Sequence, residues 1–209
     1  MAWFDNIRLR YKLLINFLLT GGILLLALLF SLIQIDAVGE KTDTIASNAL
    51  PSMQIVGEIS QARLRYRVRS LEYLLPGTPE EKAKLEQSLN KLALEVEASF
   101  AKYEPLIISE KERQVYTDAV TASQRYREVV NEAIALHKAG NEEGAQQLRR
   151  TKWVQAANNL RDQTDRLANI NREIADHAAN DVRNGVSGAI NGGWLALGCG
   201  VTLALLMGW

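Results

Sequence analysis

The apolar residues of this chain gather at its two ends, and the longest run lies near the N-terminus. Residues 13–35 contain no charged side chain, and their polar members are Asn16, Thr20, Ser31 and Gln34. At about 1.5 Å of rise per helical residue, such a run crosses a bilayer core of about 30 Å. A cleaved signal peptide has a shorter apolar run, of about 7–15 residues, and a small-residue cleavage site. The pattern therefore predicts a transmembrane helix over residues 13–35.

A second apolar segment covers residues 189–209, which are also free of charge but rich in glycine. Glycine is commoner in membrane helices than in soluble ones, and Trp194 and Trp209 lie where aromatic rings meet a membrane interface. The segment predicts a second transmembrane helix. Because no basic residues follow this span, we expect the chain to be a fragment of a longer protein.

Basic residues near the first span set the expected orientation. Arg8, Arg10 and Lys12 precede the span, and short flanks enriched in Lys and Arg stay in the cytoplasm. We therefore expect residues 1–12 to be cytoplasmic and residues 36–188 to be periplasmic. The chain is then anchored in a bacterial inner membrane.

Between the predicted spans, turn and capping residues divide the chain into four helices. The first three helices end at Pro76-Gly77, Pro105 and Gly140. The last three helices open with a capping residue followed by acidic residues, at Thr78, Ser109 and Asn141. No strand-like alternation of apolar and polar residues competes with this pattern.

The lengths of the four helices predict their arrangement. The first and fourth helices have roughly 40 to 47 residues, while the middle two have roughly 25 to 30. Short connections make sequential helices antiparallel, so both long helices run to the membrane. We expect an all-α fold, an antiparallel four-helix bundle between two transmembrane helices, with the fourth helix uninterrupted from Glu142 to the second span.

Apolar residues at helical spacing predict which face of each helix is buried. In the first helix this face is Leu64, Val68, Leu71 and Leu75. In the second helix the row runs from Leu85 to Phe100, and in the third it runs from Val115 to Leu136. In the fourth helix apolar residues recur at intervals of seven, at Trp153, Leu160, Leu167 and Ile174.

Four arginines at alternate positions form the most unusual local feature: Arg63, Arg65, Arg67 and Arg69. Helical spacing pairs Arg63 with Arg67 on one face and Arg65 with Arg69 on another. Like charges at this spacing repel, and arginine forks bind carboxylate or phosphate, so the row predicts an anion site. The alternative is a basic stripe that pairs with glutamates of a neighbouring helix or faces a second chain.

Aromatic and amide side chains could complete such a site. Tyr66 and Tyr126 offer ring walls, and they serve equally well as ordinary core residues. Gln155, Asn158 and Asn159 form an amide-rich patch that can donate and accept hydrogen bonds, although amides on a bundle helix are often only surface.

Composition argues against several classes of function. The 24 Lys and Arg residues balance the 24 Asp and Glu residues, so the chain has no excess of positive charge that would favour binding to nucleic acid. Cys199 is the only cysteine, which leaves no disulfide framework and no cysteine metal site. Glu173 and His177 are spaced to contact a metal, but two ligands do not make a site. We expect no catalysis, no metal and no cofactor.

Together these motifs resemble the four-helix-bundle sensor domain of methyl-accepting chemotaxis receptors. The basic segment 7–13, the segment Asn48-Ala49-Leu50-Pro51, the arginine row and the segment 139–145 follow the order found in that family. The resemblance implies a homodimer that binds a small anionic ligand between its first helices. It assigns the ligand's carboxylate to Arg63, Arg67 and Arg69, with Tyr66, Tyr126, Gln155, Asn158 and Asn159 as weaker contacts.

The resemblance is closest to members that sense organic acids, including C6-ring carboxylates such as quinate, shikimate, protocatechuate and benzoate. It implies that a HAMP linker and a signalling hairpin follow Trp209 and act on a cytoplasmic chemotaxis kinase and adaptor. It also implies that the signal is a small slide of the fourth helix and the second span. Two alternatives remain open: the sensor portion of a histidine kinase or nucleotide cyclase, and a membrane-tethered structural coiled coil.

Overall fold

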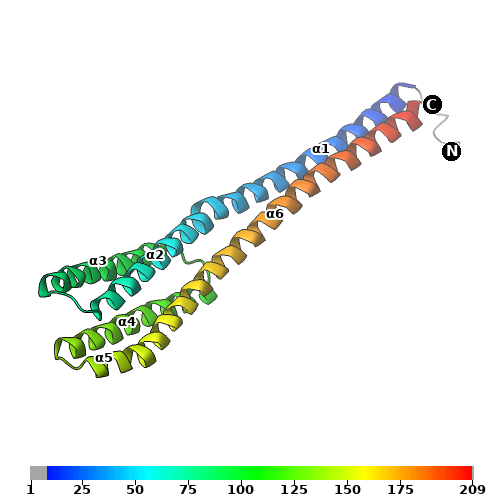
Figure 1. The fold of residues 1–209 in the computed structure, drawn as a ribbon. Coiled ribbons are helices and arrows are strands. Elements are labelled where there is room, and N and C mark those ends of the chain that lie inside the picture. Colours follow the sequence, from blue (N-terminus) through cyan, green and yellow to red (C-terminus); the bar gives the residue numbers. More distant parts are fainter. Residues whose placement is uncertain (1–8, 209) are drawn as a thin grey trace. The chain divides into compact units, whose positions relative to one another are not determined.

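The computed structural model describes residues 9–208, and the regular elements in this range are helices (Figure 1). The α-helices are α1 (Leu9–Asp43), α2 (Leu50–Tyr73), α3 (Pro79–Tyr103), α4 (Glu110–Lys138), α5 (Glu142–Leu148) and α6 (Val154–Gly208). Two π-helical segments, η1 (Thr44–Ala49) and η3 (Arg149–Trp153), and one 3-10 turn, η2 (Glu104–Leu106), connect them. The basic residue Arg8 and the expected interfacial ring of Trp209 lie outside the described residues.

Contacts divide the chain into two compact units. One unit comprises residues 46–175 and forms the helical bundle. The other comprises residues 1–45 and 176–209 and contains α1 and the C-terminal part of α6. The all-α four-helix bundle expected from the sequence is confirmed.

Within the bundle, two helical hairpins supply the four helices. In one hairpin α2 packs against α3, and in the other α4 packs against α5 and η3, which continue into α6 (Figure 1). The short connections after α2 and α4 make the helices of each hairpin antiparallel.

The helix ends follow the predicted capping residues. The Thr78 hydroxyl accepts a hydrogen bond from the Glu81 amide at 3.3 Å, and the Glu81 carboxylate accepts one from the Thr78 amide at 2.8 Å. Ser109 and Asn141 accept from the amides three residues later, at 3.2 Å and 2.9 Å. Each cap satisfies an amide that has no partner inside its helix, so the three predicted starts are confirmed.

Apolar side chains from all four helices fill the bundle in two clusters. The cluster nearer the α2–α3 turn contains four aromatic residues, and the second lies nearer the α3–α4 turn around Ile59, Phe100 and Leu167. The rows predicted for the last three helices are buried or packed against these clusters. They therefore hold the two hairpins together.

The row predicted as the buried face of the first helix was wrong for three of its four residues, and of this row Leu71 alone packs against the core. Leu64, Val68 and Leu75 are 51%, 54% and 59% exposed. The buried face consists of Ser52, Val56, Ile59, Ala62, Arg63, Tyr66, Ser70 and Tyr73. This helix carries two candidate rows, and the row that contains the tyrosines and Arg63 is the one that meets the other three helices.

The fourth helix is continuous from Glu142 to Leu203, as predicted, but it contains the π-helical segment η3 between α5 and α6. The Thr151 hydroxyl donates to the carbonyls of Gln147 at 2.8 Å and Leu148 at 3.4 Å, and so competes with the backbone for these acceptors. In the first helix, η1 ends two residues before Pro51. Proline has no amide to donate to the carbonyl four residues earlier, which weakens the regular ladder at that point.

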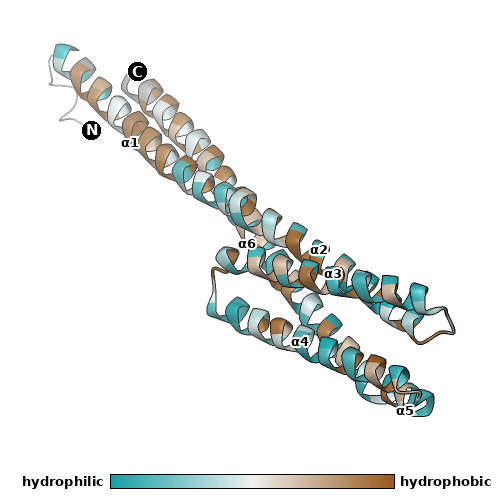
Figure 2. Cartoon of the chain, turned by 90° about the vertical axis from the view of Figure 1, so that its left-hand side faces the viewer, coloured by the Kyte–Doolittle hydropathy of each residue, from teal (hydrophilic) through white to brown (hydrophobic). Residues whose placement is uncertain are grey.

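The second unit is rich in exposed apolar side chains, which lie mainly along α1 (Figure 2). By length and composition, two helical stretches in the chain are able to cross a membrane, Arg10–Tyr73 and Glu142–Leu203. Glycine allows close packing inside this unit, because a Cβ on Gly185 would lie 2.8 Å from Cγ2 of Val38. Small residues at helix contacts are typical of membrane helices.

A polar junction ties both hairpins together near the α2–α3 turn. The Tyr73 hydroxyl of α2 donates to Glu86 of α3 at 2.7 Å, and Lys138 of α4 donates to the same carboxylate at 2.9 Å. Lys138 and, to a smaller extent, Tyr73 lower the pKa of Glu86. Burial and the bond to Glu86 raise the pKa of Tyr73 to about 12.

This junction predicts a pH-dependent contribution to stability. Because its folded-state pKa is depressed, charged Glu86 stabilises the fold above its unfolded pKa of about 4.3, and the effect is lost as pH falls through the folded value. We expect Glu86→Gln to lower the free energy of unfolding by at most about 1 kcal/mol near neutral pH, since the pair is partly exposed. Thermal unfolding by circular dichroism should show this difference shrinking in acid, and a difference that grows in acid would contradict it.

Candidate functional site

The arginine row of α2 divides between the inside and the outside of the bundle. Arg63 is buried, with 7% of its surface exposed, and Arg67 is half-buried. Arg65 and Arg69 are exposed, with side chains 60% and 50% accessible. The predicted division of the row into two faces is therefore seen, and only one of the four guanidinium groups belongs to the core.

The exposed arginines have acidic partners, and the buried one does not. Arg65 pairs with Glu95 of α3 at 3.2 Å, and Arg69 pairs with Glu72 at 2.7 Å. Within residues 9–208, no carboxylate lies within ion-pair distance of Arg63. The pKa of Arg63 is lowered by burial, and the more distant carboxylate of Asp165 opposes this shift. Arginine nevertheless keeps its proton in proteins, so a positive charge lies buried without a direct counter-charge.

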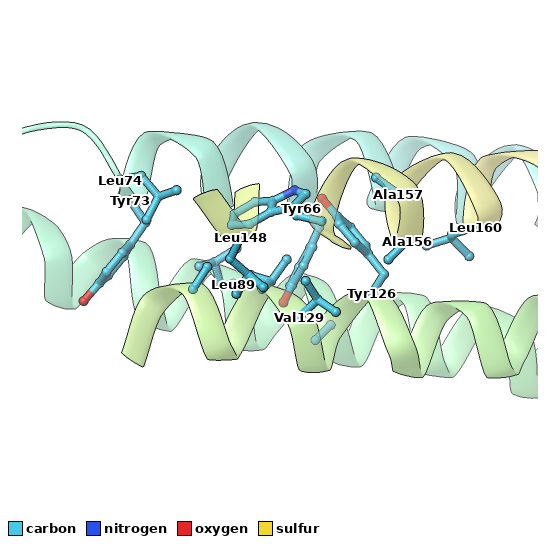
Figure 3. Packing of buried hydrophobic residues seen from close by; sticks show 14 of the residues in the cluster. Tyr66, Tyr73, Leu74, Leu89, Tyr126, Val129, Leu148, Ala156, Ala157 and Leu160 are labelled. Carbon is cyan, nitrogen blue, oxygen red and sulfur yellow. The ribbon is translucent and has the colours of Figure 1, made fainter. Parts of the chain in front are cut away.

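Two aromatic rings lie beside this charge, and a third ring packs against one of them. The rings of Tyr66 on α2 and Tyr126 on α4 pack edge to face, with centroids 5.7 Å apart (Figure 3). The ring of Trp153 on η3 packs against Tyr126 in the same way at 6.3 Å. Edge-to-face pairs of this kind fix the orientation of the rings. Burial raises the pKa values of both tyrosines, so their hydroxyls stay protonated at neutral pH.

Three buried polar atoms in this cluster have no hydrogen-bond partner among the residues that the structure describes. They are Nε of Arg63, the hydroxyl of Tyr126 and Nε1 of Trp153. The Ser70 hydroxyl and Trp153 are close enough to lower the pKa of Tyr126 in part, but neither forms a hydrogen bond of normal geometry with it. All three atoms can donate, and leaving a buried donor unpaired costs about 1–3 kcal/mol. The cluster therefore favours an acceptor.

A cavity of about 230 Å³ opens between α3 and α4 beside this cluster. Arg63, Tyr66, Tyr126 and Leu160 lie on its inner side, where they are buried. The remaining lining residues come from α3, η2 and α4: Ala93, Val96, Glu97, Phe100, Ala101, Glu104, Tyr116, Val120, Ser123, Gln124 and Arg127. The cavity is a pocket inside one bundle, with apolar walls and a single buried cation.

Charged residues at the mouth of the cavity are paired across the helices. Arg127 of α4 forms an ion pair with Glu97 of α3, and both line the cavity. Glu104, also in the lining, pairs with Arg113 of α4 at 3.2 Å. These charges are exposed and compensated, in contrast to Arg63.

The eight residues predicted for the site do not all come together. Arg63, Tyr66 and Tyr126 share the cavity. Arg69 instead lines a surface groove between α2 and α3, together with Arg65, Leu64 and Val68. The amides Gln155 and Asn159 are exposed and Asn158 is half-buried, and none of the three lines the cavity. The half-buried Arg67 lines neither the cavity nor the groove. The sequence prediction missed the walls formed by Phe100, Tyr116 and Val120.

Within residues 9–208, no group of three or more His, Cys, Asp or Glu side chains is placed to hold a metal ion. The pair Glu173 and His177 therefore has no third ligand of these types in the described part of the chain. Cys199, in the other unit, is free and exposed.

The chain matches the family model described as a four helix bundle sensory module for signal transduction over residues 6–184. It belongs to this family, and it is a sensory domain rather than a catalytic one. The module is typical of methyl-accepting chemotaxis receptors. A comparison with curated proteins gave no match.

The unpaired charge predicts an unusual effect on stability. Arg63→Met keeps a long flexible stem but removes the buried charge, so we expect the free energy of unfolding without ligand to rise by about 1 kcal/mol. Urea unfolding of the detergent-solubilised chain, followed by circular dichroism, measures the change. Arg65→Met is the matched control, because it removes an exposed and paired arginine and should change stability by less than about 0.5 kcal/mol. A large loss of stability in Arg63→Met would contradict the prediction.

Proposed function

We propose that this chain is the sensory front of a bacterial chemoreceptor that binds a small anionic ligand in the periplasm and passes the signal across the inner membrane. Residues 13–35 and 189–209 are the two spans, and residues 36–188 are the periplasmic domain. The family match and the two apolar helical stretches support this placement. In such a receptor, the signal reaches a cytoplasmic chemotaxis kinase and its adaptor.

The observation that carries the ligand proposal is the burial of Arg63 without an acidic partner. A carboxylate or other anion beside this guanidinium supplies the missing counter-charge and accepts its hydrogen bonds. Tyr126 and Tyr66 adjoin the same space. Arg67, Arg69 and the amides Gln155, Asn158 and Asn159 remain the wider set of candidate contacts.

A ligand that binds the folded state should raise the midpoint of thermal unfolding. We expect at least one class among organic carboxylates, amino acids and phosphate to raise it for the full chain in detergent. The same compound should have no effect on Arg63→Met and should still stabilise Arg65→Met, which separates binding from folding. No shift with any compound, or an equal shift in Arg63→Met, would contradict the proposed anion sensor.

The exposed row on α2 supports the proposal that the chain forms a homodimer. Leu64 and Val68 lie on the side of α2 that does not face its own bundle core, and Leu75 is exposed just after the end of this helix. Their spacing of four and seven residues is that of a coiled-coil seam. A second copy that packs α2 against α2 covers these side chains, and it places the groove that contains Arg69 near the interface.

Disulfide cross-linking tests this dimer. With Cys199→Ser as the background, Leu64→Cys should give a disulfide-linked dimer under mild oxidation in membranes, because paired α2 helices bring equivalent positions within cross-linking reach. Thr121→Cys, which is exposed on α4, should remain monomeric under the same conditions. Non-reducing gel electrophoresis distinguishes the two species, and equal cross-linking at both positions would contradict a dimer through α2.

A further inference from the structure

We infer that Tyr103, Glu112 and Asn171 form a buried polar latch that fixes the position of α6 along the bundle, and that Asn171 is the movable part of this latch. The holding of α6 by the polar latch does not depend on the proposed function, whereas its use in signalling rests on that proposal. Asn171 is then a positioning residue of the sensor, because it acts on α6 and not on a ligand.

The polar latch is a chain of hydrogen bonds inside the core, and its three side chains are fully buried. Nδ2 of Asn171 donates to the Tyr103 hydroxyl at 2.5 Å, and this hydroxyl donates to Oε1 of Glu112 at 2.6 Å. The second oxygen of Glu112 accepts from the Ile108 amide at 3.0 Å. Burial and the bond to Glu112 raise the pKa of Tyr103, so the hydroxyl keeps the proton that it donates.

The polar latch joins α6 to the connection between α3 and α4. Tyr103 is the last residue of α3, and Glu112 lies in the first turn of α4. Glu112 also binds the Ile108 amide, which lies between these two helices, so this side of the latch is held from both ends. Asn171 belongs to α6, the helix that continues to Gly208. A buried side chain of α6 is therefore tied to the turn at one end of the bundle.

Asn171 lies in a buried row of α6 in which residues recur at intervals of seven, at Ala157, Thr164 and Asn171. Apolar contacts are not directional, so they hold a helix against sliding less strictly than a hydrogen bond does. A single buried Asn in such a row fixes the register, because its amide finds a partner in one arrangement only. The Tyr103 hydroxyl is this partner.

The polar latch opens by loss of one hydrogen bond. Nδ2 of Asn171 also donates to the Leu167 carbonyl of its own helix at 2.9 Å, and the Tyr103 hydroxyl keeps its bond to Glu112 when Asn171 leaves. Oδ1 of Asn171 has no hydrogen-bond partner among the residues that the structure describes. Because a buried acceptor without a partner is unfavourable, the closed latch gains less than a fully bonded network. Closed and open positions of α6 are thus close enough in energy for both to be accessible.

The fixed side of the polar latch adjoins the cavity between α3 and α4. The ring of Tyr116, which lines the cavity, stacks on the ring of Tyr103 with centroids 5.9 Å apart. Phe100, another lining residue, packs edge to face on Tyr116 at 6.0 Å. An occupant of the cavity that moves Tyr116 also acts on the ring whose hydroxyl binds Asn171. These rings form a contiguous packed route from the cavity to α6.

The test measures the position of α6 and needs no ligand. In a Cys199→Ser background, spin labels at Gln87→Cys on α3 and Asn169→Cys on α6 report a distance by double electron–electron resonance. Both positions are exposed. The labelled full chain in detergent is diluted with unlabelled chain, so that distances within one chain are measured.

We expect a single narrow distance for the chain with an intact latch. Asn171→Leu keeps a side chain of similar size but removes the bond, so the distance should broaden or shift by about 1–2 Å or more. Its thermal midpoint by circular dichroism should not fall, because the unpaired Oδ1 is removed as well. Tyr103→Phe removes the same bond from the other side and should change the distance in the same way.

Thr164→Val is the matched control. Thr164 is as buried as Asn171, but its hydroxyl donates to the Leu160 carbonyl of its own helix at 2.7 Å. Its loss breaks no bond between helices, so the distance should stay unchanged. Should Asn171→Leu fail to fold, Asn171→Ala removes the same bond without a bulky replacement.

The outcomes keep the polar latch and the proposed function apart. An unchanged, narrow distance in the folded Asn171 variant would overturn the latch, because apolar packing alone would then set the position of α6. An equal change in Thr164→Val would also overturn it, since loss of any buried polar group would then suffice. If the thermal panel of carboxylates, amino acids and phosphate gives no shift, the anion sensor is wrong, and a distance change in Asn171→Leu and Tyr103→Phe alone still supports the latch.

Discussion

A positive charge buried in a helical core without an acidic partner is the constraint on which this molecule depends. Transferring an ion from water into a protein interior costs several kcal/mol, and a partner normally offsets that cost. Arg63 lies among Tyr66, Tyr126 and Leu160 with no carboxylate at ion-pair distance in the described chain. The fold tolerates it because capped helices and two apolar clusters supply stability elsewhere. A site that is unfavourable when empty favours occupation by an anion.

Helix α2 has two sides with different environments, one that faces the bundle core and one that is exposed. Its tyrosine row packs into the bundle, while Leu64, Val68 and Leu75 point away from the core. Leaving such a row in water is unfavourable, because full burial of one Val or Leu side chain stabilises a protein by about 1.5–3 kcal/mol. Arg63 belongs to the buried row while Arg65 and Arg69 are exposed, so the environments of these arginines differ although their sequence positions look equivalent. One helix therefore carries both the internal cation and the face that we propose for the dimer.

The parts of the fold that could be predicted from the sequence are those fixed by local chemistry. The capping residues Thr78, Ser109 and Asn141 bond to amides three residues away, so their role follows from neighbouring residues alone. The buried row of α2 could not be predicted this way, because two rows have similar periodicity and only tertiary packing decides between them. The π-helical turn η3 was missed for a related reason, since a threonine that bonds to earlier carbonyls is common in regular helices as well.

The site, like the fold, could be predicted only where the chemistry of single residues reveals it. The arginine row and the tyrosines were found because their chemistry is visible in the sequence, and the structure places Arg63, Tyr66 and Tyr126 together. Phe100 and Tyr116 were assigned to the core or passed over, because an apolar pocket wall has the same spacing as ordinary core.

The geometry of the cluster also bears on how binding changes the protein. A ligand can bias a receptor only by binding one arrangement of the helices more tightly than another. The donors that surround the cavity come from α2 and α4, while Trp153 packs on Tyr126 from η3, the turn that directly precedes α6. The anion that we propose beside Arg63 and Tyr126 would change the surface against which Trp153 packs. Because η3 has a π-helical hydrogen-bond pattern, a shift to regular α-helix there changes the register of the residues that follow. The segment η3, which reaches the cavity residues through the contact of Trp153 with Tyr126, is thus the part of the fourth helix whose hydrogen-bond pattern allows two arrangements.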